Sequence, residues 1–326
     1  MTRARIAGTG HYLPEKIVTN LDLEKIVDTT DEWIRQRTGI GQRHVAAEGE
    51  ATSDLAVEAA RRAMDAAGAS PDEIELIICC TTTPDHLFPA TACLVQERLG
   101  AKNAGAFDLN AACSGFVYGI ATADAFIRSQ TFGTILLIGA EVATNRLNWA
   151  KRDTAVLFGD GAGAVVIRGE NGDRGIVTTY LGADGADAEL LMLPGGGSRI
   201  PPTRDNIESD VHDFHMQGPE LFKRAVVAFG TAITRAFENG SAAVDDLDLF
   251  VPHQANSRII LSAADRVGLP RDKVFLNLER VGNTTAASIP IALDEAVKAG
   301  RLEEGSLVLL ASFGAGLTWG SALIRW

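Results

Sequence analysis

Hydrophobic runs along the chain alternate with segments whose hydrophobic positions recur every three or four residues. Runs with the length and composition of buried strands occupy residues 75–80, 104–109, 134–139 and 159–168. Segments with helical spacing, several of them bounded by proline or glycine, occupy residues 31–39, 52–67, 89–100, 115–129 and 218–237. Strands that alternate with helices in this way predict an α/β fold built from layers.

One segment departs from this alternation. Residues 185–218 contain a Pro-Gly-Gly-Gly sequence and a Pro-Pro pair, and they show no sustained period. The segment therefore predicts a long excursion away from the sheet. Excursions of this length in compact domains are usually functional or mobile.

The second half of the chain repeats the pattern of the first. Residues 72–78 align with residues 245–251 at an offset of 173 residues, and three shorter matches follow in the same order at similar offsets. We therefore predict two duplicated α/β halves, residues 1–171 and residues 172–326. The turn sequence Asn-Gly-Asp lies at their junction.

The repeat places polar side chains in corresponding loops. Aligning the strands before Cys113 and Asn283 places Cys113 opposite residues 281–283, and aligning the earlier buried strands places Cys80 opposite His253. Related halves bring such loops together near their pseudo-twofold axis. Ligand sites of α/β sheets lie at the ends of the strands, so we expect Cys113, His253 and Asn283 to meet there.

Composition narrows the function classes. The net charge of −12 argues against general nucleic-acid binding. The four cysteines lack C-x-x-C spacing and are too few for a disulfide framework, so we expect a reducing compartment and no metal site. No segment has the roughly 18 apolar residues of a membrane span, and the N-terminus lacks the features of a signal peptide. We expect a cytoplasmic protein.

Cys113 is the candidate nucleophile, because it lies between a predicted strand and a predicted helix. Backbone N–H groups and the helix dipole favour an anion there, and such placement lowers a thiol pKa by about one to several units. A buried structural cysteine is the alternative. Taken singly, His253 at a strand end and Asn283 after glycine are also common structural residues.

The motifs around these three residues resemble those of β-ketoacyl-acyl-carrier-protein synthase III. They are Ala-Ala-Cys-Ser-Gly-Phe at 111–116, Pro-His-Gln-Ala-Asn at 252–256, Gly-Asn-Thr at 282–284 and a glycine-rich ending at 313–322. The resemblance runs essentially from end to end. It implies a thiolase-like fold with five α-β-α-β-α layers and two duplicated halves, and it implies a homodimer.

The resemblance also implies a reaction that starts type II fatty acid synthesis and needs no cofactor beyond its substrates. Cys113 takes an acyl group, usually acetyl, from acyl-CoA. Malonyl-acyl carrier protein then loses CO2, and its enolate attacks the acyl-enzyme to give acetoacetyl-acyl carrier protein. His253 and Asn283 donate to the malonyl thioester oxygen, and the backbone N–H groups of Cys113 and Ala315 bind the acyl oxygen.

Substrate and partner contacts follow from the same resemblance. Trp33, Arg37 and Arg152 match positions that bind CoA, and Phe88 matches a residue that lines the partner subunit's acyl pocket, where its bulk favours a short primer. Positions that dock acyl carrier protein fall on Lys223, Gln254, Ala255, Asn256, Ser257 and Arg258. Asp265 stands where the family has a further basic residue, which weakens this patch.

Other readings of a cysteine, a histidine and an asparagine stay open. A priming synthase of a polyketide pathway has the same expected machinery, and type III polyketide synthases share the three residues but are commonly longer. Elongating synthases usually pair the cysteine with two histidines. A papain-like hydrolase has the same chain order without the internal repeat, and a non-catalytic homologue would be expected to have lost Cys113.

Overall fold

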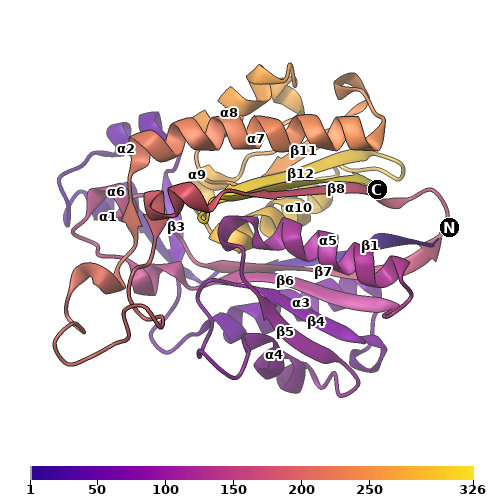
Figure 1. The fold of residues 1–326 in the computed structure, drawn as a ribbon, viewed down its shortest axis with the longest axis horizontal. Coiled ribbons are helices and arrows are strands. Elements are labelled where there is room, and N and C mark those ends of the chain that lie inside the picture. The colour runs from indigo at the N-terminus through magenta and orange to yellow at the C-terminus, as the bar shows by residue number, and fades with distance from the viewer. Residues whose placement is uncertain (1) are drawn as a thin grey trace.

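The computed structural model describes residues 2–326 and consists of two β-sheets with helices outside and between them (Figure 1). The strands of the first sheet, in the order β1-β7-β6-β4-β5, are β1 (Thr2–Tyr12), β4 (Leu76–Cys80), β5 (Gly105–Leu109), β6 (Thr134–Glu141) and β7 (Gly161–Asn171). The strands of the second sheet, in the order β11-β12-β13-β8, are β8 (Gly175–Ala183), β11 (Leu249–Pro252), β12 (Leu307–Gly314) and β13 (Thr318–Arg325).

The helices form three layers around these two sheets, as Figure 1 shows. The pair outside the first sheet is α3 (Thr52–Ala67) and α4 (Thr91–Leu99), and the pair outside the second sheet is α7 (Gly218–Gly240) and α8 (Ser257–Arg266). The pair between the sheets is α5 (Gly115–Arg128) and α10 (Ser288–Lys298). The predicted α-β-α-β-α fold is confirmed.

Shorter elements complete the chain. They are β2 (Lys16–Thr19), α1 (Asn20–Leu23), α2 (Asp31–Thr38), β3 (Gln42–Val45), α6 (Arg152–Ala155), β9 (Leu191–Met192), β10 (His215–Met216) and α9 (Leu278–Val281). The two strands β9 and β10 pair with each other inside the predicted excursion from the sheet. Helix α4 and strand β7 each begin two residues later than predicted, β7 and α7 each end three residues later, and the other predicted elements lie within two residues of their predicted ends.

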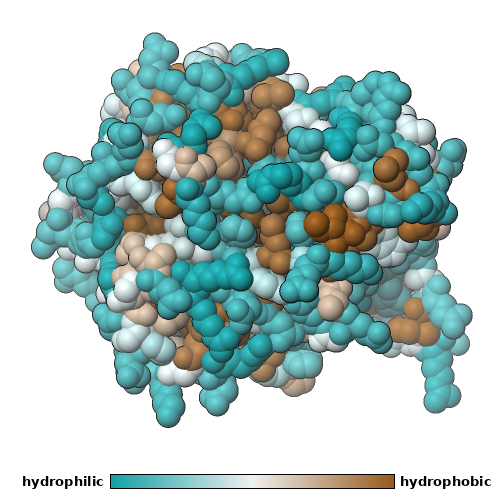
Figure 2. Space-filling view, turned by 180° about the vertical axis from the view of Figure 1, so that it is seen from behind, coloured by the Kyte–Doolittle hydropathy of each residue, from teal (hydrophilic) through white to brown (hydrophobic). Residues whose placement is uncertain are grey.

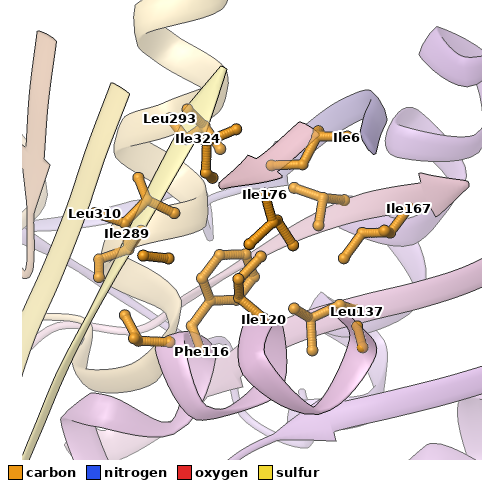
Figure 3. Packing of buried hydrophobic residues seen from close by; sticks show 14 of the residues in the cluster. Ile6, Phe116, Ile120, Leu137, Ile167, Ile176, Ile289, Leu293, Leu310 and Ile324 are labelled. Atoms are coloured by element: carbon orange, nitrogen blue, oxygen red, sulfur yellow. The ribbon is translucent and has the colours of Figure 1, made fainter. Parts of the chain in front are cut away.

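The largest hydrophobic core lies between the two sheets. Phe116 and Ile120 of α5 pack with Ile289 of α10 against strands of both sheets (Figure 3). Because α5 and α10 are covered on both sides, their apolar faces are wide, and helix α5 has a mostly buried first half. Burial of this central layer joins the halves into one body.

Matching strand orders confirm the duplication. In the first sheet Leu76 pairs with Ile135, and in the second Leu249 pairs with Val308, which fixes the offset at 173 residues for both strands. The 3-10 turns before the central helices, at residues 112–114 and 285–287, have the same offset. The boundary between residues 171 and 172 stays a prediction.

One detail of the predicted alignment is wrong. Cys113 corresponds to Ala286 and not to residues 281–283, because the second half inserts the short helix α9 before its 3-10 turn. The correspondence of Cys80 with His253 follows from the register of the sheets. Corresponding loops therefore do meet, but with different residues at the position of the thiol.

Hydrophilic side chains cover most of the face seen in Figure 2, and hydrophobic groups between them form small patches. Leu87 and Phe88 are the most exposed large hydrophobic residues, with relative exposures of 85% and 86%. Among residues 2–326, no helix is both long enough and apolar enough to cross a membrane. The same residues contain no cluster of His, Cys, Asp and Glu side chains suited to a metal ion.

Candidate active site

The sharp turn before α5 presents Cys113 to a cavity. Ala112 has a φ of 48°, a left-handed conformation that is uncommon for a residue with a side chain, and Asn110 Oδ1 accepts from its N–H at 3.2 Å. Gly314 at the end of β12 lies directly against the turn, since a Cβ there would be 2.8 Å from the Cys113 nitrogen. The thiol is therefore held between the two halves.

His253 follows β11, and a serine hydroxyl contacts one nitrogen of its ring. Its Nδ1 lies 2.6 Å from Ser288 Oγ, and the Gln254 N–H donates to the same oxygen at 3.3 Å. A Ser288 hydroxyl that donates to Nδ1 leaves the imidazole proton on Nε2, the tautomer that can donate into the cavity. Burial lowers the pKa of His253 to about 3, so the ring is neutral.

Asn283 is fixed by its backbone and by its side chain. Its N–H donates to Leu157 O at 2.9 Å, and its carbonyl accepts from Gly159 N at 3.0 Å. The side-chain Oδ1 accepts from Thr285 N at 2.9 Å, which leaves the NH2 group as a free donor. Thr285 has a φ of 47°, so the turn matches the one that holds Cys113.

Cys113, His253 and Asn283 line one narrow cavity of about 130 Å³. Phe313 also lines it, and the cavity continues toward Phe222 and Asn256 near the surface. A second cavity of about 510 Å³ meets the first at Cys113. The structure thus brings together the three residues that the sequence analysis nominated from distant segments.

The thiol of Cys113 is held in its neutral form. Burial raises its pKa to about 12, with a further contribution from the buried carboxylate of Glu141, while the backbone N–H groups of Cys113 and Ala315 oppose the shift. A helix N-terminus by itself favours the thiolate, but in this structure loss of hydration at the buried sulfur is the largest influence on the pKa of Cys113. The two N–H groups are those expected to bind an acyl oxygen.

The three expected CoA contacts form a surface cluster. The Arg152 guanidinium lies 4.5 Å from the centre of the Trp33 ring, and that of Arg37 lies 5.5 Å from it. Arg152 also lines a cavity of about 730 Å³ beside the 185–217 excursion. An indole next to two cations suits a planar base and its phosphates.

Phe88 lies apart from these cavities. Its side chain is 86% exposed, and it lines none of the cavities that contain Cys113. Within one chain Phe88 therefore contributes nothing to the acyl pocket, which leaves only the expected contribution to a partner subunit.

Four of the six expected carrier-protein contacts are exposed or line the narrow cavity. Lys223 and Arg258 are exposed, and the Arg258 guanidinium lies 5.5 Å from the centre of the Phe222 ring at the mouth of the narrow cavity. Ala255 and Asn256 line that cavity.

The structure does not place the Gln254 side chain in this patch. Gln254 is 1% exposed, and its side chain bonds to Pro252 O, Phe275 O and the Asn277 N–H. Ser257 Oγ donates to Thr38 O, so it supports α2 from beneath.

Asp265 weakens the positive charge of the basic patch less than its own charge suggests. It forms a two-point ion pair with Arg271, with contacts of 3.0 and 2.6 Å. The negative charge is therefore compensated locally, at a surface site where such pairs contribute little to stability.

Sequence analysis missed the groups that orient the site. Ser288 and the Thr285 N–H fix His253 and Asn283, yet neither belongs to a motif that signals chemistry by itself. A signal existed in the repeat. At an offset of 173 residues, Asn110 aligns with Asn283, and each Oδ1 accepts from the N–H two residues later.

Similar solved structures define the class of protein. The 3-oxoacyl-acyl-carrier-protein synthase III of Aquifex aeolicus VF5 aligns with a TM-score of 0.92 and 46% identity over 99% of this chain and 100% of that one. The priming β-ketosynthase of the R1128 polyketide pathway aligns with a TM-score of 0.91 and 35% identity, over 98% of this chain and 96% of that one. Fold and site together define a condensing enzyme of the thiolase-fold class.

Sequence comparison identifies the family within this class. Models of 3-oxoacyl-acyl-carrier-protein synthase III and of its C-terminal part match residues 107–185 and 237–326. The β-ketoacyl-acyl-carrier-protein synthase III of Caldanaerobacter subterraneus subsp. tengcongensis is 50% identical over 99% of this chain and 98% of its own length. The chain belongs to the β-ketoacyl-acyl-carrier-protein synthase III family, and it is an acyltransferase.

Proposed function

We propose that the chain condenses an acyl-CoA primer, acetyl-CoA by preference, with malonyl-acyl carrier protein. The products are acetoacetyl-acyl carrier protein, CO2 and CoA, and the reaction starts type II fatty acid synthesis. One observation carries the proposal: a buried thiol of the first half and two fixed hydrogen-bond donors of the second half line the same narrow cavity. The name of a relative with 50% identity supports the same substrate class.

The first step transfers the acyl group to Cys113. The sulfur attacks the thioester carbonyl, the bond from that carbonyl to the CoA sulfur breaks, and the thiol proton leaves with CoA as its new thiol. Backbone N–H groups of Cys113 and Ala315 stabilise the oxyanion of the tetrahedral intermediate. Because burial raises the pKa of Cys113 to about 12, the thiolate forms only as the substrate arrives and the proton is transferred.

The second step uses the donors of the other half. The malonyl carboxylate leaves as CO2, and its bonding electrons form an enolate whose oxygen accepts hydrogen bonds from His253 Nε2 and the Asn283 amide. The enolate carbon then attacks the acyl-enzyme, the bond to the Cys113 sulfur breaks, and the released thiolate takes up a proton from water. Both donors are neutral and neither has an acidic proton to give, so the carbanion is stabilised without being quenched.

The two substrates contact two different clusters of basic residues. Trp33, Arg37 and Arg152 bind the nucleotide of CoA by stacking and by phosphate contacts. Lys223 and Arg258 form a basic patch beside Phe222, at the mouth of the narrow cavity, that suits an acidic carrier protein.

The enzyme works as a homodimer in this proposal. Strand β5 is the last strand of the first sheet and leaves one edge unpaired within the chain. Leu87 and Phe88 are almost fully exposed in one chain. A second copy covers them and receives Phe88 at its acyl pocket, which restricts the primer to a short chain.

Intact-protein mass spectrometry tests the proposal in two stages. Acetyl-CoA alone should add one acetyl group to the wild type and none to Cys113→Ser. Addition of malonyl-acyl carrier protein should discharge that group as acetoacetyl-acyl carrier protein. Discharge only by malonyl-CoA would contradict the carrier-protein assignment and favour a polyketide type of synthase, and absence of any acetyl adduct would contradict the primer.

A further inference from the structure

Arg43 of β3 is a buried charge that the proposed chemistry does not use. It is 0% exposed, and its terminal nitrogens contact neutral oxygens: both donate to Asn20 Oδ1 at 3.0 Å, and single bonds reach Val18 O and Val156 O at 3.1 and 2.8 Å. Within residues 2–326 its Nε has no hydrogen-bond partner. A fully buried guanidinium usually pairs with a carboxylate, so this arrangement calls for a function.

One branch of this network leads to the helix that carries the indole. Asn20 is 1% exposed, and its Nδ2 donates to Asp31 Oδ1 and to Ile40 O, both at 2.8 Å. Asp31 is the first residue of α2, and Ile40 follows the end of that helix. Asn20 therefore fixes both ends of the helix on which Trp33 lies.

The other branch of the network leads to α6, the helix that begins with Arg152. Val156 directly follows α6, whose first residue is Arg152, and the carbonyl of Val156 accepts the shortest Arg43 bond. Across the surface, Arg152 lies 4.5 Å from the Trp33 ring centre. The buried Arg43 and Asn20 thus connect α2 and α6 beneath the surface cluster in which Trp33 and Arg152 meet.

We propose that Asn20 and Arg43 are positioning residues for CoA, and that they hold α2 and α6 at the separation needed to bind the nucleotide. The inference rests on the proposed CoA contacts at Trp33 and Arg152. It predicts a defect confined to thioesters that contain the nucleotide, because the network ends at those contacts. The shorter acetyl-pantetheine presents the same reacting carbonyl without the nucleotide and is therefore the reference substrate.

Asn20 is the better residue to change. A Cβ at Gly159 or at Gly282 would lie 3.0 Å from the Arg43 Cβ, so an Arg43 variant would also disturb the segments that fix Asn283. Asn20→Asp keeps the shape and an acceptor for Arg43, but it replaces the Nδ2 donor with an oxygen that faces the Asp31 carboxylate. The change removes the bonds toward α2 and retains the acceptor for Arg43, now as an ion pair.

Acetylation rates measured by mass spectrometry test the inference. For Asn20→Asp we expect kcat/KM with acetyl-CoA to fall about tenfold through KM, with the rate for acetyl-pantetheine unchanged. The double variant Asn20→Asp with Asp31→Asn exchanges amide and carboxylate, restores the hydrogen bond between residues 20 and 31 but not the one to Ile40 O, and should recover part of the loss. Gln36→Glu is the matched control, because Gln36 Nε2 donates to the Glu32 carboxylate on the exposed side of α2.

The outcomes distinguish the positioning role of Asn20 and Arg43 from the proposed CoA site on which it rests. An equal loss with both substrates, or no loss with either, would overturn the positioning role. If Asn20→Asp does not fold, Asp31→Ala removes the same bond at its partly exposed end and should give the same selective loss. Trp33→Ala tests the CoA site itself. If Trp33→Ala leaves the preference for acetyl-CoA intact, the proposed CoA site is wrong. If Trp33→Ala abolishes this preference and Asn20→Asp leaves it unchanged, only the positioning role is wrong.

Discussion

The two halves of the molecule share a backbone but divide the chemistry. At positions related by 173 residues, the first half has Cys80, Cys113 and Gly115, where the second has His253, Ala286 and Ser288. In the second half, Ser288 Oγ lies 2.6 Å from His253 Nδ1.

In the first half the corresponding pair is inert. A Cβ at Gly115 would lie 3.3 Å from the Cβ of Cys80, and burial raises the pKa of the Cys80 thiol far above its ordinary value. In the proposed mechanism one half thus supplies the nucleophile and the other supplies the hydrogen-bond donors. The two duplicated halves have similar backbones at these positions, and a few side-chain differences distinguish their proposed roles.

The largest effect should come from exchanging the thiol between halves. Cys113→Ala should reduce condensation by more than ~10³-fold, because no acyl-enzyme forms. Adding Ala286→Cys should not restore an acetyl adduct, since Ala286 is 1% exposed and lines neither cavity that contains Cys113. An adduct on the double variant, detected by mass spectrometry, would contradict the division of roles.

The donors of the second half should affect one step only. We expect His253→Ala to lower malonyl decarboxylation by about 10²- to 10³-fold and to leave acetylation of Cys113 largely intact. Cys80→Ala is the matched control in the first half and should alter neither rate by more than about twofold. The two steps are followed separately, as released CO2 and as the acetyl adduct; an equal loss of both for His253→Ala would remove the proposed division.

The buried neutral imidazole should also make stability depend on pH. Burial lowers the pKa of native His253 to about 3, whereas an unfolded histidine has a pKa of about 6.5. The unfolded chain therefore binds a proton that the native state excludes, and stability present above pH ~6.5 is lost as the pH falls toward 3.

Between pH 7 and pH 5 this difference amounts to about 2 kcal/mol of unfolding free energy. Denaturant titrations of the wild type and of His253→Gln should show that much less loss for the variant. A parallel pH dependence of the two proteins would indicate that His253 is protonated in the native state.

The smallest effect should come from the hydroxyl that sets the tautomer. Ser288→Ala makes this position resemble Gly115 of the first half, and we expect decarboxylation to fall about tenfold with acetylation unchanged. Nitrogen NMR of the His253 ring should show the proton on Nε2 in the wild type and a mixture of tautomers in the variant. A single unchanged tautomer in Ser288→Ala would contradict the role of Ser288.

The sequence determined the layers, the repeat and the three residues that we propose to have chemical roles. Hydrophobic periods report burial along a strand or helix, and motifs such as Pro-His-Gln-Ala-Asn are local, so both can be read without coordinates. Insertions such as α9 have no such signature. Because α9 changes the spacing without changing the pattern around it, the sequence alignment placed Cys113 opposite residues 281–283, whereas the structure places it opposite Ala286.

Tertiary structure alone decided how those residues are tuned. The pKa of Cys113 rises because the surrounding core displaces water and because the negative charge of Glu141 lies nearby, and both effects depend on atoms distant in sequence. The tautomer of His253 depends on Ser288, which lies 35 residues away. The link from Arg43 to both walls of the proposed CoA site likewise exists only when β3, α1 and the end of α6 meet in the folded chain. A sequence specifies which groups are present, whereas hydration, distance and hydrogen-bond direction arise from packing.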